Sequence, residues 1–117
     1  MRSLLAISIV LLAAGCVRAD VQRLDQAPRP ERSPDAVQLL LEKPDRPYTV
    51  IAVVEAKADA IFKDFDDLRS RMIEEAAKLG GDAVILGAED SESTFLITAT
   101  GQIRKKLRGE VIVYRRP

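Results

Sequence analysis

The chain has 117 residues, of which 47% are hydrophobic and 31% charged, a composition that is ordinary for one globular domain. Its 18 basic and 18 acidic residues balance, which gives no reason to expect a nucleic acid as partner. It has no histidine and only one cysteine, so it lacks the common nucleophile–base pairs of enzymes and the ligands of soft metals. A carboxylate pair that includes Glu55 or Asp59 remains a conceivable alternative, but no spacing places such a pair across a cleft. We therefore expect no catalysis and no cofactor.

The N-terminus has the features of a bacterial export signal. Arg2 precedes an apolar run over residues 4–14 that is interrupted only by Ser8 and is too short to span a bilayer. The run ends in Leu12-Ala13-Ala14-Gly15-Cys16, which resembles the lipobox of bacterial lipoproteins, with Ala13 where leucine is commoner. The resemblance implies cleavage between Gly15 and Cys16 and lipidation of Cys16. The alternatives are a free cysteine near an ordinary cleavage site, or an uncleaved anchor.

Lipidation would determine where the protein resides. Two or three acyl chains form an essentially permanent membrane anchor, and once Cys16 carries them no cysteine is left for a disulfide. In lipoprotein sorting, aspartate after the cysteine retains a protein at the inner membrane. Val17 stands there, so we expect the outer membrane, with the domain in the periplasm. Loss of residues 1–15 leaves 17 basic against 18 acidic residues.

Residues 17–34 are polar, show no hydrophobic period and contain Pro28, Pro30 and Pro34. This composition predicts a flexible, partly polyproline tether after Cys16. A recognition segment for an envelope partner is the alternative.

Residues 35–117 are expected to form the folded domain. Apolar and β-branched stretches predict strands at 37–41, 48–56, 83–86, 94–103 and 109–114, with a polar turn at 89–93 and a basic hairpin tip or loop at 104–107. The predicted order is β-β-α-β-β-β, an α+β domain in which one helix packs on a mostly antiparallel sheet.

Residues 62–79 supply the predicted helix. Apolar residues recur at helical spacing: Ile61, Phe65, Leu68, Met72, Ala76 and Leu79. Gly80 stands where a left-handed residue ends a helix, and Gly81 lets the chain reverse into the next strand.

One helix covers only one face of a sheet, yet residues 48–56 and 83–86 are apolar on both. We therefore expect the second face to be covered by a protein partner, a second copy or a loop. A sheet that curls enough to bury both sides is the alternative.

The strand at 48–56, the corner Leu79-Gly80-Gly81-Asp82-Ala83 and the closing residues 109–114 resemble a loose domain family. This family includes the YbjQ-type domains named for heavy-metal binding and the Rcs stress-sensor lipoprotein of the enterobacterial outer membrane. The resemblance implies a compact α+β domain, sometimes assembled into rings. The chain departs from it in having no histidine for a metal and no cysteines for the disulfides of the sensor.

Three clusters are candidate binding sites. Asp64, Asp66 and Asp67 could hold a hard cation, although negative charge at a helix start explains them fully. Glu89, Asp90 and Glu92 of the acidic turn could also hold a hard cation, or could form only a solvated hairpin tip. A basic cluster could contact anionic lipid or lipopolysaccharide, or could only keep a hairpin tip soluble; it contains Arg104, Lys105, Lys106 and Arg108, with Arg115 and Arg116 nearby.

These observations predict a membrane-anchored lipoprotein of the cell envelope that acts as an interaction, sensor or accessory module. The alternative is a periplasmic module that binds a hard metal ion or an anionic envelope ligand.

Overall fold

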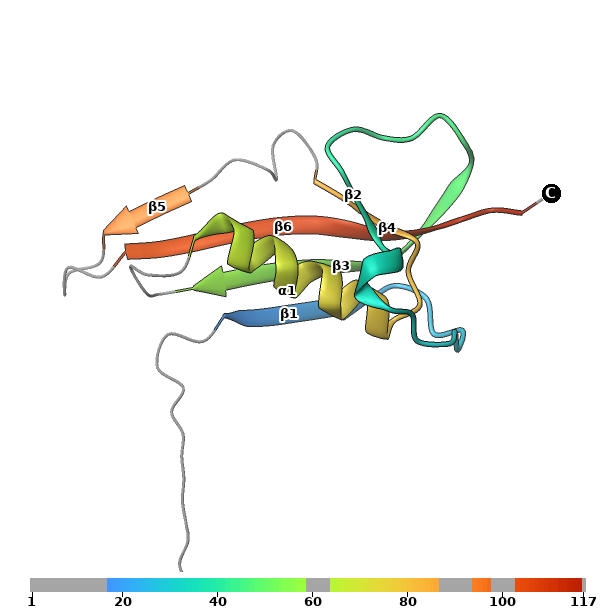
Figure 1. The fold of residues 1–117 in the computed structure, drawn as a ribbon, viewed down its shortest axis with the longest axis horizontal. Coiled ribbons are helices and arrows are strands. Elements are labelled where there is room, and N and C mark those ends of the chain that lie inside the picture. Colours follow the sequence, from blue (N-terminus) through green and yellow to red (C-terminus); the bar gives the residue numbers. More distant parts are fainter. Residues whose placement is uncertain (1–16, 59–63, 87–93, 98–102, 117) are drawn as a thin grey trace, which may run out of the picture.

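A computed structural model of the protein describes residues 17–58, 64–86, 94–97 and 103–116. In this part of the chain one helix, α1, lies across one face of a sheet (Figure 1). The elements are β1 (Arg18–Arg23), the 3₁₀ turn η1 (Pro34–Ala36), β2 (Gln38–Leu40), β3 (Tyr48–Ala58), α1 (Phe65–Lys78), β4 (Ala83–Ile85), β5 (Thr94–Ile97) and β6 (Ile103–Tyr114). The predicted α+β fold, one helix on a mostly antiparallel sheet, is confirmed.

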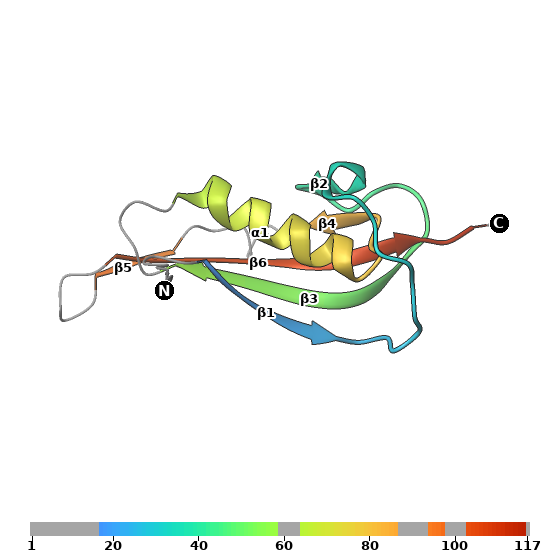
Figure 2. The same cartoon turned by 60° about the horizontal axis from the view of Figure 1, so that its bottom comes forward.

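The strands lie side by side in the order β1-β3-β6-β4-β2, and β5 pairs with the first residues of β6. All neighbours are antiparallel except β2 and β4, which are parallel. The 11 residues of β3 and the 12 of β6 form the spine of the sheet, which is seen at a slant in Figure 2. At about 3.3 Å per residue this spine is about 35 Å long, so it has two well-separated ends.

The core lies between α1 and the spine. Leu68, Met72 and Ala76 are fully buried, as the helical period predicts. Gly109 lets the helix come close, because a Cβ atom there would stand 2.7 Å from Met72 Cε. No helix in the described ranges is long and apolar enough to cross a membrane.

Both ends of α1 are capped by local sequence. Asp64 Oδ1 accepts a hydrogen bond from the Asp67 amide at 3.1 Å, and Asp67 Oδ2 accepts one from the Asp64 amide at 2.9 Å. Gly80 adopts the predicted left-handed conformation, with φ of 78°. The helix begins at Phe65 rather than at residue 62; the positions 59–63 lie outside the described residues.

Part of the predicted tether belongs to the sheet. Residues 18–23 form β1, which pairs with β3 from Arg18↔Lys57 to Arg23↔Ala52. After β1 the chain stays on the domain, because the Arg32 amide donates to the carbonyl of Ala77 at 2.8 Å. The prediction of a flexible tether is therefore wrong for these residues. In this strand only Ala19 and Val21 are apolar, which is too few to predict a strand from the sequence. The strand forms because it pairs with the edge of β3.

The predicted basic hairpin tip is part of a strand. Residues 104–107 lie within β6, and the predicted strand at 94–103 is divided between β5 and the start of β6. A strand sends successive side chains to opposite faces, so Leu107 is buried while Lys106 and Arg108 are exposed. The basic residues therefore do not form one tip.

The second face of the sheet is apolar only in part. At one end Ala83, Ile85 and Ile112 are at most 3% exposed, with Tyr48 and Tyr114 among the side chains packed against them. Towards the other end the same face carries charged residues from β1, β3 and β6. Three apolar residues of this face are therefore buried within the chain, while Tyr48, Val50 and Tyr114 are half-buried. A partner or a second copy stays a prediction.

Candidate functional site

Asp82 organises the end of the sheet where β6 finishes. Asp82 directly follows the Gly80-Gly81 turn after α1. The backbone of Asp82 bonds to two strands: the amide donates to the Ile112 carbonyl at 2.8 Å, and the carbonyl accepts from the Gln38 amide at 3.2 Å. Its carboxylate accepts from the Tyr114 amide at 2.8 Å and from the Arg32 guanidinium. The carboxylate thus holds β4, the end of β6 and the segment before η1 together.

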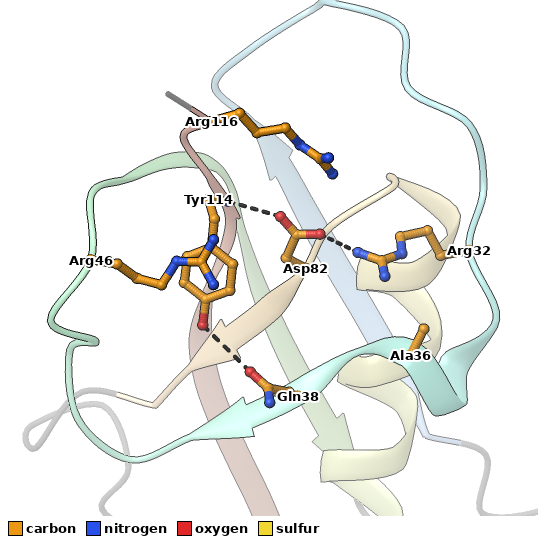
Figure 3. Close-up of a pocket in the computed structure, with 7 residues that line it drawn as sticks. All are labelled: Arg32, Ala36, Gln38, Arg46, Asp82, Tyr114 and Arg116. Atoms are coloured by element: carbon orange, nitrogen blue, oxygen red, sulfur yellow. Dashed lines mark hydrogen bonds and ion pairs between the residues drawn. The ribbon is translucent and has the colours of Figure 1, made fainter.

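An open pocket of about 570 Å³ surrounds this aspartate (Figure 3). It is lined by Arg32, Ala36, Gln38, Arg46, Asp82, Tyr114 and Arg116. A second hollow of similar volume adjoins it, shares Asp82 and Arg116, and adds Arg29 and Gly80. We call the two hollows together the arginine pocket.

The arginines of the pocket differ in what they contact. Arg32 pairs with Asp82, and Arg29 pairs with Asp25 at 3.1 Å. The Arg46 guanidinium lies 3.8 Å from the centre of the Tyr114 ring, a cation–π contact that leaves its N–H edges available. Among the described residues, neither Arg46 nor Arg116 forms an ion pair.

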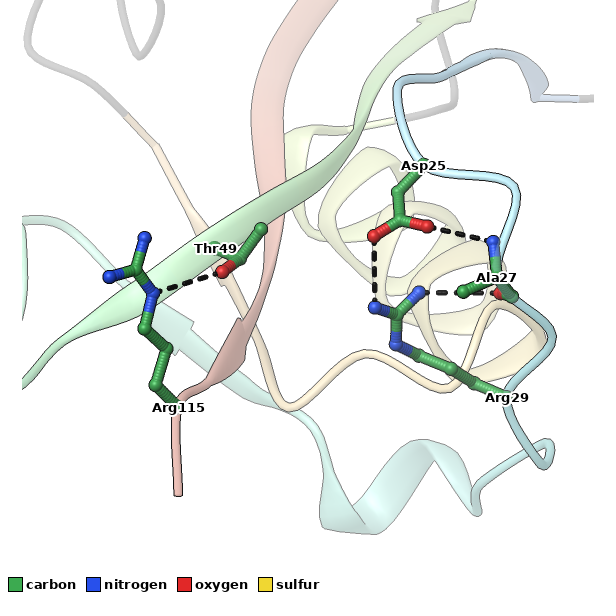
Figure 4. A network of polar contacts seen from close by, with 5 residues as sticks. All are labelled: Asp25, Ala27, Arg29, Thr49 and Arg115. Carbon is green, nitrogen blue, oxygen red and sulfur yellow. Dashed lines mark hydrogen bonds and ion pairs between the residues drawn. The ribbon is translucent and has the colours of Figure 1, made fainter. Parts of the chain in front are cut away.

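Polar contacts fix the two loops that carry these arginines (Figure 4). Arg115 donates to Thr49 Oγ1 at 3.2 Å, and its amide donates to Pro47 at 3.0 Å, which ties the end of β6 to the loop of Arg46. On the other side, Asp25 accepts from the Ala27 amide and from Arg29. The hydrogen bond from the Ala27 amide and, to a smaller extent, the one from Arg29 hold the pKa of Asp25 below its usual value.

The basic cluster predicted from sequence is divided between two places. Arg116 lines the arginine pocket, whereas Arg108 and Lys106 lie about 26 and 33 Å away along the chain, towards the start of β6. Arg104 and Lys105 belong to β6, but their side chains lie outside the described residues, as do Gly15, Cys16 and the acidic turn of Glu89, Asp90 and Glu92.

The three aspartates at the start of α1 have structural roles. Asp64 and Asp67 form the capping box, and Asp66 pairs with Arg69. Across the described ranges no group of three histidine, cysteine, aspartate or glutamate residues could hold a metal ion.

Sequence reasoning missed the arginine pocket because its basic residues come from positions 29, 32, 46 and 116. One signal was present. Asp82 is the polar residue between the Gly-Gly turn and a fully apolar strand, and the strand order places it beside β6 and β2.

Comparison with models of known protein families finds no match, and comparison with curated proteins finds none. Among solved structures, the chain is similar to the crystal structure of a Francisella virulence factor, FvfA, with a TM-score of 0.56 and 17% identity. The match covers 81% of this chain and 96% of that chain. At this identity the similarity supports the fold alone, and the resemblance to the YbjQ-type and Rcs sensor domains stays a prediction.

Proposed function

We propose that the chain is a lipid-anchored lipoprotein of the cell envelope that acts as an interaction or sensor module through the arginine pocket. The observation that carries the proposal is the pair Arg46 and Arg116, which line a hollow of about 570 Å³ with no ion pair to a described residue. A guanidinium presents its donors in a planar fork that fits a carboxylate or a phosphate. The pocket would therefore receive an anionic group of this kind.

The charge of the pocket supports an anionic occupant. Its first hollow has three arginines and one acidic residue, Asp82, whose carboxylate is engaged by Arg32 and by the Tyr114 amide. An incoming anion would meet Arg46 and Arg116 with little competition from Asp82. Tyr114 holds Arg46 by its ring, so that part of the rotamer entropy of this arginine is lost before binding.

The anchor rests on the sequence. The apolar run at 4–14 and the lipobox-like residues that end at Gly15 and Cys16 support cleavage and lipidation, and Val17 supports the outer membrane. The domain would then lie in the periplasm. The alternative from the sequence is a periplasmic module that binds an anionic ligand or a hard metal ion. The arginine pocket supports the anionic ligand, whereas no group of the described residues supports a metal site.

The pocket is tested by thermal unfolding of the mature lipidated protein in detergent, with sodium phosphate against sodium chloride at equal ionic strength. A ligand that binds only the folded state raises the melting temperature. We expect phosphate to raise it for the wild type but not for Arg46→Ala/Arg116→Ala.

The matched control is Arg69→Ala/Lys78→Ala, which removes two cations of α1 that lie outside the pocket lining. It should keep the response to phosphate. An equal response in both double variants would contradict the pocket. For the anchor, Cys16→Ser should move the protein from the membrane to the soluble fraction, and continued membrane association would contradict lipidation.

A further inference from the structure

Beside the proposed lipid anchor, the sheet carries a row of three basic residues. Arg18 lies opposite Lys57 in the β1–β3 pair, and Lys57 lies opposite Lys106 in the β3–β6 pair. Directly opposed residues of neighbouring strands point to the same face, so the three cations form a line across the sheet. We call it the cation row.

Like charges that stand opposite one another destabilise a sheet, so the cation row is a local cost to folding. The next positions on the same face relieve part of it. Lys57 lies 3.2 Å from Asp20 and 3.5 Å from Glu55, and Lys106 lies 3.3 Å from Glu55. The hydrogen bond to Asp20 and its charge, followed by the charge of Glu55, raise the pKa of Lys57.

The carboxylates do not neutralise the patch. Arg108 lies opposite Glu55 and is exposed, and Glu110 follows it on the same face of β6. This part of the face therefore carries four basic residues and three acids: Arg18, Lys57, Lys106 and Arg108 with Asp20, Glu55 and Glu110. The patch keeps a net charge of about +1, and its first row is wholly basic.

The position of the cation row relative to the anchor follows from β1. Only Val17 stands between Cys16 and the first residue of β1, so Arg18 can lie at most about 7 Å from the cysteine. Strands are about 4.8 Å apart, which places the backbones of Lys57 and Lys106 about 5 and 10 Å from that of Arg18. These distances are close to the screening length of about 8 Å at physiological salt.

We propose that the cation row is a membrane-docking surface, which binds the anionic phospholipid headgroups of the membrane that holds the protein's own lipid. The inference rests on the proposed lipid anchor. A patch of this charge attracts anionic headgroups only close to their surface, and the short connection to Cys16 keeps it there. Docking would bring the cation-row end of the sheet to the membrane and leave the arginine pocket at the other end of the spine.

The test measures the reaction of each lysine with an amine-acylating reagent, followed by mass spectrometry. The full mature lipidated protein is reconstituted into vesicles of phosphatidylcholine alone, or of phosphatidylcholine with 30% phosphatidylglycerol. Lys57 and Lys106 should react several-fold more slowly in the anionic vesicles. Lys43 and the 59%-exposed Lys78, both at the pocket end, should react equally in the two.

Two variants separate docking from other causes of protection. Lys106→Glu should abolish the slowing at Lys57, whereas Lys78→Glu, the same charge change on α1, should preserve it. A flexible ten-residue spacer between Val17 and Arg18 should reduce the slowing, since it frees the row from the membrane surface.

The outcomes also separate the two proposals. If the protein fails to float with either vesicle, the lipid anchor and the docking surface are both wrong. If it floats with both vesicles and Lys57 and Lys106 react equally in them, the docking surface alone is overturned.

Discussion

The two ends of the β3–β6 spine both gather basic side chains but present them differently. At the pocket end, Arg46 and Arg116 line a hollow and have no ion pair among the described residues. At the other end, Lys57 and Lys106 lie on an open face with Asp20 and Glu55 beside them. A hollow with uncommitted guanidiniums suits one compact anion, whereas a flat, partly neutralised row suits an extended anionic surface. Charge alone does not distinguish these roles, but its local geometry does.

The largest effect is expected from Gly80→Ala, which disrupts the pocket end alone. Gly80 has a φ of 78°, and an added Cβ would stand 2.6 Å from Arg29 Cβ and 2.7 Å from the Pro30 carbonyl oxygen. We expect a loss of about 2–4 kcal/mol in the free energy of unfolding, from the strained backbone and the overlap together. Denaturant titration measures it. Lys78→Ala, an exposed neighbour on α1, should change stability little, and equal losses in the two variants would contradict this packing.

A smaller effect is expected from Asp82→Ala, with Asp20→Ala as its counterpart at the other end. Removing the Asp82 carboxylate leaves the Tyr114 amide and Arg32 without their acceptor, at a cost of about 1–3 kcal/mol. Asp20 is 73% exposed, and its pair with Lys57 should contribute no more than about 0.5 kcal/mol. The same denaturant titration compares the two. A loss for Asp20→Ala as large as that for Asp82→Ala would show that the two ends are not organised differently.

The smallest effects concern pH, and they have opposite directions at the two ends. The folded-state pKa of Asp25 is lowered, so its contribution is present above its ordinary value of 3.8 and is lost as the pH falls through the lowered pKa. The folded-state pKa of Lys57 is raised, so its contribution is present below 10.5 and is lost as the pH rises through the raised pKa. Thermal melts across pH should show a flatter acid limb for Asp25→Asn and a flatter alkaline limb for Lys57→Gln. The reverse assignment would contradict both contacts.

The parts of the fold that were predicted correctly are those with strong local signals. These signals are the helical period of Leu68, Met72 and Ala76, the left-handed Gly80 and the apolar sequence of β3. Each of them can be recognised from neighbouring residues in the chain alone. β1 was missed because its pairing with β3 is decided by tertiary contact, not by the alternation of Ala19 and Val21. The arginine pocket was missed for the same reason: strand order and the Asp82 contacts bring its residues together.

The central claim is that Arg46 and Arg116 hold an anionic group. Nuclear magnetic resonance of the arginine Nε–Hε groups, followed while inorganic phosphate is added to the mature protein at constant ionic strength, tests it most directly. The account predicts saturable shifts at Arg46 and Arg116, with little change at Arg69 and Arg71, whose guanidiniums pair with Asp66 and Glu75 on α1. Shifts of equal size at all four arginines, or no saturable shift at Arg46 and Arg116, would contradict it.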